Sequence, residues 1–178
     1  AFGVSKDGPL KEDGIKLINK MNDLGISLDL SHLSENSFKR AIKETKLIPI
    51  ATHSNCKKIR RHERNLSNKQ LKNISDLGGV IGIVLYNRFI SSKKNVSISD
   101  ILPHFKNILN ICGEDHISLG SDIDGAPIKD FPNEIRKPSD FEKISDMLKK
   151  NKIKSKIIDK FLGQNILRVL DENLKNKK

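Results

Sequence analysis

The sequence contains no tryptophan and one tyrosine, and only two of its 178 residues are cysteine. Cys56 and Cys112 form neither a C-x-x-C pair nor the spacing of a zinc knuckle, which argues against a disulfide framework and favours a reducing compartment. No run approaches the ~20 apolar residues that a membrane-spanning helix needs. No apolar run with a basic front edge begins at Ala1, so no secretory signal is visible. We therefore expect a cytoplasmic protein without a membrane span.

Acidic residues are also in the minority, because 33 Lys and Arg outnumber 22 Asp and Glu and give a formal net charge of +11. A basic chain invites a comparison with nucleic-acid-binding modules. The lysines, however, are scattered over every expected helix face, and no aromatic residues that would stack bases are interleaved with them. The charge pattern is typical of a solvated basic surface, and we expect no nucleic-acid partner.

Strand-like apolar runs alternate with amphipathic helical segments along the chain. Four runs have the length and composition of buried strands, at residues 26–30, 47–51, 80–86 and 116–120. This alternation predicts a parallel α/β sheet. The G-x-G-x-x-G motif of dinucleotide-binding folds does not follow the first run, which weakens that alternative.

Capping residues mark where the helices between these runs begin. Ser67 and Gln70 form the pattern of a capping box, and Ser99 has the position of a cap before a later apolar helix. The last helix carries apolar residues up to Leu170. The residues that follow it, 172–178, are predicted to form a polar, frayed tail.

Three of the expected strands end in polar residues that are capable of chemistry: His32, His53 and Asp122. In parallel α/β folds, and in barrels above all, functional sites lie at the carboxyl ends of the strands. A histidine offers a ring nitrogen to zinc, and an aspartate can move a proton between a water and a leaving amine. Each residue alone is more often structural, and Asp122 or Asp124 alone is more often a turn residue. Their coincidence at equivalent strand ends favours a metal site.

A basic loop follows His53 and contains three arginines and a histidine, at Arg60, Arg61, His62 and Arg64. Such a run is usually a solvated surface, but one arginine over the strand ends can hold a substrate carboxylate with two parallel hydrogen bonds. Composition does not say which arginine does so. His62, His104 and His116 do not follow a strand, and we interpret them as structural residues.

Five segments together resemble the motifs of the renal (membrane) dipeptidase family, in the order and spacing of that family. The segments are Asp29-Leu30-Ser31-His32-Leu33-Ser34, Ala51-Thr52-His53-Ser54, Arg64-Asn65-Leu66, Leu119-Gly120-Ser121-Asp122-Ile123-Asp124-Gly125 and Gly163-Gln164-Asn165-Ile166-Leu167-Arg168-Val169-Leu170. Tyr86 and Asn87 also match a segment near the site of that family, and we assign them no role. Glu63 replaces a proline that is usual before the R-N-L arginine.

The resemblance implies a zinc-dependent dipeptidase built on a (β/α)8 barrel of the amidohydrolase type. The present chain would be the C-terminal half of that barrel, with about four β/α units and parallel strands in one partial domain, 1–178. By resemblance, His32 and His53 would bind the second of the family's two zinc ions. Arg64 would hold the carboxylate of the dipeptide substrate, and Asp122 would carry the proton from the attacking water to the leaving amine.

The ligands of the family's first zinc, a His-x-Asp pair and a glutamate shared by both metals, lie upstream of anything that matches Ala1. We therefore expect at most one zinc in this chain. Its partner would be an N-terminal half-barrel polypeptide or a second copy. A half-barrel is also expected to expose two sheet edges and an apolar interior. The rival hypothesis is a catalytically inactive remnant or a scaffold subunit of a split dipeptidase.

Overall fold

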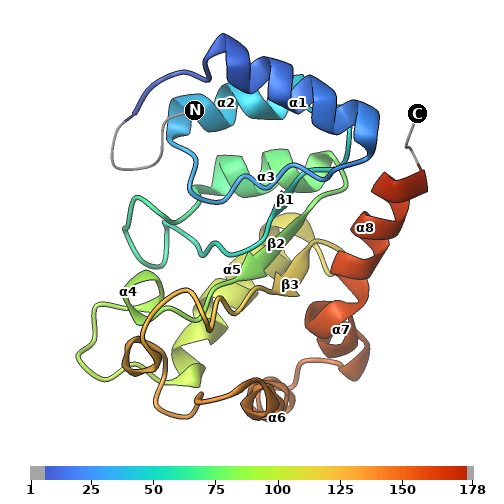
Figure 1. Cartoon of the computed structure of the whole chain (residues 1–178). Helices are drawn as coiled ribbons and strands as arrows, with labels where there is room; N and C mark the ends of the chain where they lie inside the picture. The colour runs from blue at the N-terminus through green and yellow to red at the C-terminus, as the bar shows by residue number, and fades with distance from the viewer. Residues whose placement is uncertain (1–6, 176–178) are drawn as a thin grey trace.

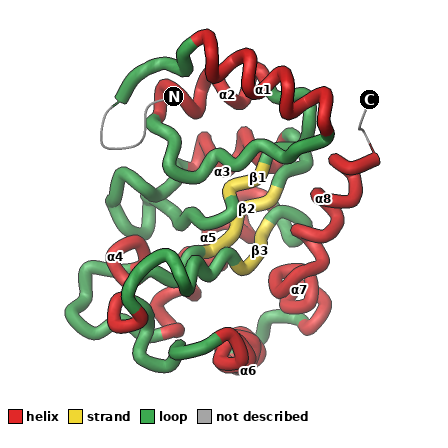
Figure 2. Tube along the Cα trace, viewed as in Figure 1, coloured by secondary structure: helices red, strands yellow, loops and turns green. Residues whose placement is uncertain are grey.

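The computed structural model describes residues 7–175, in which helices surround one small parallel sheet (Figures 1 and 2). The strands are β1 (Ile50–Ala51), β2 (Val80–Ile83) and β3 (Ile117–Leu119). The α-helices are α1 (Glu12–Leu24), α2 (Glu35–Glu44), α3 (Asn68–Asp76), α4 (Asn87–Ile90), α5 (Leu102–Cys112), α6 (Glu142–Lys150), α7 (Ser155–Asp159) and α8 (Asn165–Lys175). Short 3-10 turns lie at Ile98–Ile101, Ile128–Asp130 and Pro138–Phe141, and a π-helical turn, η4, at Lys160–Gln164 joins α7 to α8.

The sheet has the order β1-β2-β3 and both pairings are parallel, as the alternation of strands and helices predicts. The prediction of four strands is wrong in one respect, because residues 26–30 do not form a full strand. This segment lies parallel to β1 but makes a single bridge, between Asp29 and Ile50. It has only β1 as a neighbour in the described part of the chain, and the backbone turns away at Ser31 and His32.

One face of the sheet forms the main hydrophobic core with the helices behind it. Ala51, Ile81, Ile83 and Ile117 on this face are fully buried. Helices α3 and α5 cover them, contributing Leu71, Ile74, Phe105 and Ile108 among other buried side chains. Burial of this apolar surface is the main stabilising contribution to the half-barrel.

The opposite face, which would line the interior of a closed barrel, is covered in a way that the sequence did not predict. Ile50 and Val80 form a second small cluster with Val169 of α8. Further along the strands, a Cβ added at Gly82 or Gly120 would lie only 2.0 or 1.7 Å from the carbonyl oxygen of Thr52. In the described residues, α8 covers one end of this face and backbone covers the other. An apolar hollow lined by Val80, Gly82, Leu119 and Ile166 remains between them, so the expected exposed apolar interior is present only in part.

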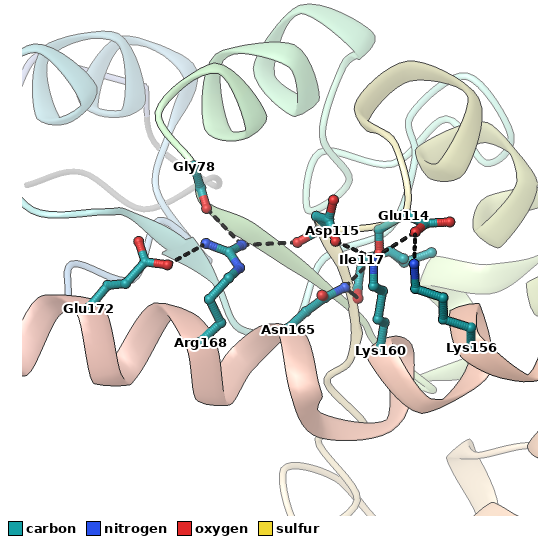
Figure 3. Close-up of polar contacts among 9 residues, drawn as sticks. All are labelled: Gly78, Glu114, Asp115, Ile117, Lys156, Lys160, Asn165, Arg168 and Glu172. Atoms are coloured by element: carbon teal, nitrogen blue, oxygen red, sulfur yellow. Dashed lines mark hydrogen bonds and ion pairs between the residues drawn. The ribbon is translucent and has the colours of Figure 1, made fainter.

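Helix α8 runs across the ends at which the strands begin and is fixed there by polar side chains (Figure 3). The Asn165 amide donates to the carbonyls of Glu114 and Ile117, both at 2.8 Å. Arg168 donates to the carbonyls of Gly78 and Asp115, both at 3.0 Å. These contacts hold α8 against the starts of β2 and β3.

The same helix continues further than expected, to Lys175, so residues 172–175 of the predicted frayed tail are helical. Asn173 explains why, because it is 1% exposed and donates through Nδ2 to the Ile48 carbonyl at 2.8 Å. Its Oδ1 accepts from the Ile48 amide at 2.9 Å. The remaining tail residues, 176–178, lie outside the described residues. Within residues 7–175, no helix has the length and apolar character required to cross a membrane.

Candidate active site

The side chains singled out from the sequence follow the carboxyl ends of neighbouring strands. His32 follows the segment paired with β1, and His53 follows β1 itself. Asp122 follows β3, where the Leu85 amide donates to the Ser121 carbonyl at 3.2 Å and ties the ends of β2 and β3 together. Arg64 arrives from the loop after β1. The parallel sheet thus gathers groups that are up to 90 residues apart in the sequence, from His32 to Asp122, at one edge.

The two histidines meet directly. Their Nε2 atoms lie 2.8 Å apart, and their ring centroids are 4.9 Å apart with planes tilted by 60°. Two ring nitrogens at this distance share a proton, and a tetrahedral zinc bound to both would hold them slightly further apart. The structure therefore brings the two predicted zinc ligands to one point.

A hydrogen-bonded chain fixes the tautomer of His53. The Thr52 hydroxyl donates to Asp29 Oδ2 at 2.6 Å, so its oxygen is left to accept from His53 Nδ1 at 2.7 Å. A proton on Nδ1 leaves the lone pair of Nε2 free for a metal. Asp29 and Thr52 were not recognised as functional residues from the sequence, although both stand in the segments that carry the two histidines.

The carboxylate of Asp29 also organises the backbone around the pair. Its Oδ1 accepts from the amides of Ser31 at 2.9 Å and Thr52 at 3.0 Å. Burial pushes the pKa of Asp29 upwards, but hydrogen bonds from Thr52 and Ser31 outweigh it and hold that pKa below its ordinary value. Asp29 is thus an ionised acceptor that supports His53 through Thr52.

Two glycines determine where His53 lies. The Thr52 carbonyl rests against the Cα positions of Gly82 and Gly120, where a side chain on either residue would collide with it. The next turn is fixed by the Ser54 amide, which donates to the Gly82 carbonyl at 2.7 Å. The backbone before and after His53 is therefore packed directly on the inner face of the sheet.

His32 and Asp122 share an uncommon backbone conformation. Their φ angles are +67° and +56°, in the left-handed region that residues other than glycine rarely adopt. Such residues concentrate at functional sites, where the surrounding structure maintains the strain. Asp122 is further constrained by Gly125, since a Cβ there would lie 2.4 Å from Asp122 Oδ1. The glycine leaves room for the carboxylate above the turn.

Arg64 is buried, with 7% of its surface exposed, but its guanidinium is incompletely paired. Nε and Nη2 have no hydrogen-bond partner among the described residues. The Cζ atom lies 5.4 Å from the centre of the Phe89 ring, a cation–π distance. Burial lowers the pKa of Arg64, while the negative charges of Asp122 and Asp29 oppose that shift. A buried cation with unpaired donors is suited to bind an anionic group.

The surroundings of His32 favour its neutral form. Burial lowers the pKa of His32, the Arg64 and His53 charges lower it further, and Asp122 and Asp29 partly compensate. Arg64 and Asp122 thus act electrostatically on His32. Neutral imidazole is the form that binds a metal.

The donor set is partial. Within residues 7–175, no group of three or more His, Cys, Asp or Glu side chains is arranged to hold a metal ion. The two imidazoles therefore fit part of a zinc site, and water or groups from elsewhere would complete a four-coordinate shell.

The other histidines lie outside the pair. His62 packs against Phe89 with the ring centroids 4.7 Å apart and the planes tilted by 57°. Its Nδ1 accepts from the Arg64 amide at 3.1 Å, so it supports the arginine loop. His104 is fully buried in the core, and His116 Nδ1 lies 2.7 Å from the Gly79 carbonyl. The expectation that His104 and His116 are structural agrees with these positions.

The parallel strands and the helices that alternate with them define a partial α/β-barrel. The chain belongs to the membrane dipeptidase family, peptidase family M19, because the family model matches residues 1–178. It is 34% identical over 173 residues to an uncharacterized protein in the pqqA 5′ region of Klebsiella pneumoniae. It is 32% identical over 170 residues to an uncharacterized dipeptidase of Schizosaccharomyces pombe.

Solved structures agree with this assignment. A metallopeptidase from Rhodobacter sphaeroides, liganded with a phosphinate mimic of L-Ala-D-Ala, superposes with a TM-score of 0.89 at 26% identity. An amidohydrolase from Pseudomonas aeruginosa superposes with a TM-score of 0.90, also at 26% identity.

The alignments cover 94% of this chain but only 63% of the Klebsiella protein and 40% of the yeast protein. The superpositions cover 96% of this chain and 49% of the Rhodobacter structure, and 98% and 61% for the Pseudomonas structure. The chain thus spans about half the length of the relatives that it matches.

Proposed function

We propose that this chain supplies half of a zinc-dependent dipeptidase site, in which His32 and His53 bind one zinc ion. The observation that carries the proposal is the convergence of the two Nε2 atoms, 2.8 Å apart, with the Nε2 lone pair of His53 left free by its tautomer. Family membership supports zinc as the metal and a peptide bond as the target. A bound zinc would polarise the scissile carbonyl and lower the pKa of the attacking water.

Arg64 is proposed to hold the substrate carboxylate. Its unpaired Nε and Nη2 point to an acceptor with two oxygens, and Phe89 stabilises the plane of the guanidinium. A dipeptide has such a carboxylate at its C-terminus. The substrate class is supported by the yeast relative, named as a dipeptidase, and by the dipeptide mimic bound to the Rhodobacter enzyme.

Asp122 is proposed to move the proton. Its carboxylate is held over Gly125 in a strained turn at the end of β3, and its charge acts on both His32 and Arg64. It would take the proton from the attacking water and return it to the amine that leaves.

The site would be completed by an N-terminal half-barrel polypeptide or by a second copy of this chain. The chain alone is expected to bind at most one zinc, because it presents two ligands. We place the protein in a reducing compartment such as the cytoplasm, in line with its free cysteines, Cys56 and Cys112.

Kinetics on the completed barrel test the proposal. With zinc and the complementary half present, Asp122→Asn should lower kcat on simple dipeptides at least ~100-fold, the scale of losing a general acid–base group. Zinc content should stay unchanged. Full kcat in this variant would assign proton transfer elsewhere, with Asp124 as the next candidate. A complete barrel that binds zinc but hydrolyses no dipeptide would favour the rival hypothesis of an inactive scaffold.

A further inference from the structure

Helix α8 has two apolar faces, and among residues 7–175 only one of them is covered. Ile166 and Val169 pack with Ile50 and Val80 on the inner face of the sheet. On the other side, Leu167 is 65% exposed, Leu170 is 40% exposed and Leu174 is 65% exposed. Positions 167, 170 and 174 are three and four residues apart and therefore share one helical face.

The helix cannot rotate to bury these leucines. Asn165 and Asn173 are 3% and 1% exposed, and both are hydrogen-bonded to backbone where the strands begin. Arg168 adds its two bonds to the Gly78 and Asp115 carbonyls, as Figure 3 shows. Rotation would break all of these bonds together and leave the buried amides of Asn165 and Asn173 and their carbonyl partners unpaired, and each unpaired buried group destabilises the fold.

A helix with apolar residues on two sides is suited to lie between two layers. The first layer is the sheet of this chain. The second is absent from the described residues, in which β3 pairs on one edge only, with β2. This chain covers 49% of one superposed structure and 61% of the other, so those barrels have a further part that this sequence does not span.

We propose that Leu167, Leu170 and Leu174, here called the leucine face, form the seat on which the remaining part of the barrel packs. The inference deepens the proposed function and rests on its incomplete barrel, but it does not depend on catalysis. Seating that part against α8 would cover the leucine face and bring a strand to the free edge of β3. Helix α8 would then lie between the two halves and hold the strand starts of this half at the same time.

Co-expression tests the seat. The segments of the Klebsiella and Rhodobacter proteins that this chain does not span are each produced with the full 178-residue chain, and the mass of the complex is measured by light scattering after gel filtration. A one-to-one complex with at least one segment is expected. Absence of a complex with both segments would overturn the proposal.

The leucine face is then tested with a double variant, Leu167→Glu together with Leu174→Glu. Its affinity for the segment should fall about 100-fold, because two apolar side chains at the centre of an interface become charged. The matched control is Ile59→Glu, since Ile59 is 39% exposed and lies in the loop after His53, at the other end of the strands. The control should bind within about twofold of the original chain, the range of a peripheral substitution.

A second variant guards against misfolding. Leu167→Met with Leu174→Met keeps the apolar face and should bind like the original chain. Unchanged affinity in the glutamate variant, with an intact circular-dichroism spectrum, would refute the seat. So would a homodimer that depends on the leucines and excludes the segment, because the occupant would then be a second copy.

The outcomes separate this inference from the proposed function. A complex that forms through the leucine face but hydrolyses no dipeptide would contradict the function and leave the seat intact. Hydrolysis that persists at equal affinity in the glutamate variant would contradict the seat and leave the function intact.

Discussion

The Nε2 atoms of His32 and His53 lie 2.8 Å apart although the residues are 21 positions apart in the chain. The sheet creates this proximity, because the segment before His32 pairs in parallel with β1, which precedes His53. The Asp29 carboxylate bonds both turns, through the Ser31 amide and through Thr52. Asp29, Ser31 and Thr52 thus preorganise the two imidazoles without lying between their Nε2 atoms.

Thr52→Val tests the support of His53. The variant keeps the shape of the side chain but removes the hydroxyl that joins His53 Nδ1 to Asp29. Without it the tautomer is no longer fixed, and zinc affinity should fall ~10–100-fold, the usual effect of losing such a partner. Thr52→Ser, which keeps the hydroxyl, should bind zinc within a few-fold of the original chain. Equal affinity of the valine variant in calorimetric titration would show that the chain of bonds does not matter.

Arg64→Met is expected to stabilise the fold and to weaken substrate binding. Removing a buried guanidinium whose Nε and Nη2 lack partners should raise the free energy of unfolding by about 1 kcal/mol. In the completed barrel the same variant should raise KM for dipeptides more than it lowers kcat, because the carboxylate contact is made in ground and transition states alike. Urea titration and steady-state kinetics measure the two effects. A destabilised variant with unchanged KM would contradict the assigned role.

Gly82→Ala should displace the turn that carries His53. The added Cβ would lie 2.0 Å from the Thr52 carbonyl oxygen, so the backbone has to move or the fold has to loosen. We expect a loss of about 2 kcal/mol or more in unfolding free energy, as for overpacked cores, together with weaker zinc binding. Gly163→Ala is the control, since nothing lies within 4 Å of a Cβ there. Equal free energies of unfolding for the two variants would show that the close approach at Gly82 does not constrain the fold.

Burial of the neutral His104 ring is expected to make the free energy of unfolding depend on pH. Its Nδ1 accepts from the Cys56 amide at 3.0 Å, and its Nε2 donates to the Ile90 carbonyl at 2.9 Å, so the buried ring is neutral. Burial lowers the pKa of His104, although the bond to Ile90 opposes the shift. The unfolded chain therefore takes up a proton first as the pH falls. Stability should be complete above pH ~6.5 and decrease below it, by at most ~1.4 kcal/mol per pH unit for one proton.

Denaturation between pH 7 and 5 checks this dependence. His104→Gln should flatten the slope, even if the variant is less stable at every pH. His62→Gln should flatten it less, because His62 is partly exposed and its pKa is lowered mainly by limited burial. An identical slope in the original chain and the His104 variant would assign the dependence to other groups.

The sequence predicted those features of the fold that depend on neighbouring residues alone. The parallel alternation follows from apolar runs of the right length, and the Ser67–Gln70 capping box forms as its spacing predicts. The prediction that Ser99 caps the next helix was less accurate. The capping residue is Ser97, which stands before the 3-10 turn Ile98–Ile101 and forms a capping box with Asp100. The position of histidines and Asp122 after strands was visible for the same reason, although their roles remain proposals.

Features that depend on distant contacts were not predictable in this way. The first expected strand is reduced to one bridge, between Asp29 and Ile50, and has only β1 as a neighbour among the described residues. The approach of Thr52 to Gly82 and Gly120 joins three strand ends and has no signature beyond the glycines themselves. The position of α8 depends on side chains such as Asn173, whose partner Ile48 is 125 residues away.

The central claim, that His32 and His53 together bind one zinc ion, is tested most directly by calorimetric titration of the purified chain with zinc. The account predicts a single site that is lost in both His32→Ala and His53→Ala. Its affinity should decline only below the ordinary histidine pKa of ~6.5, because the pKa of His32 is lowered by burial. Zinc binding that is unchanged in both alanine variants would contradict it.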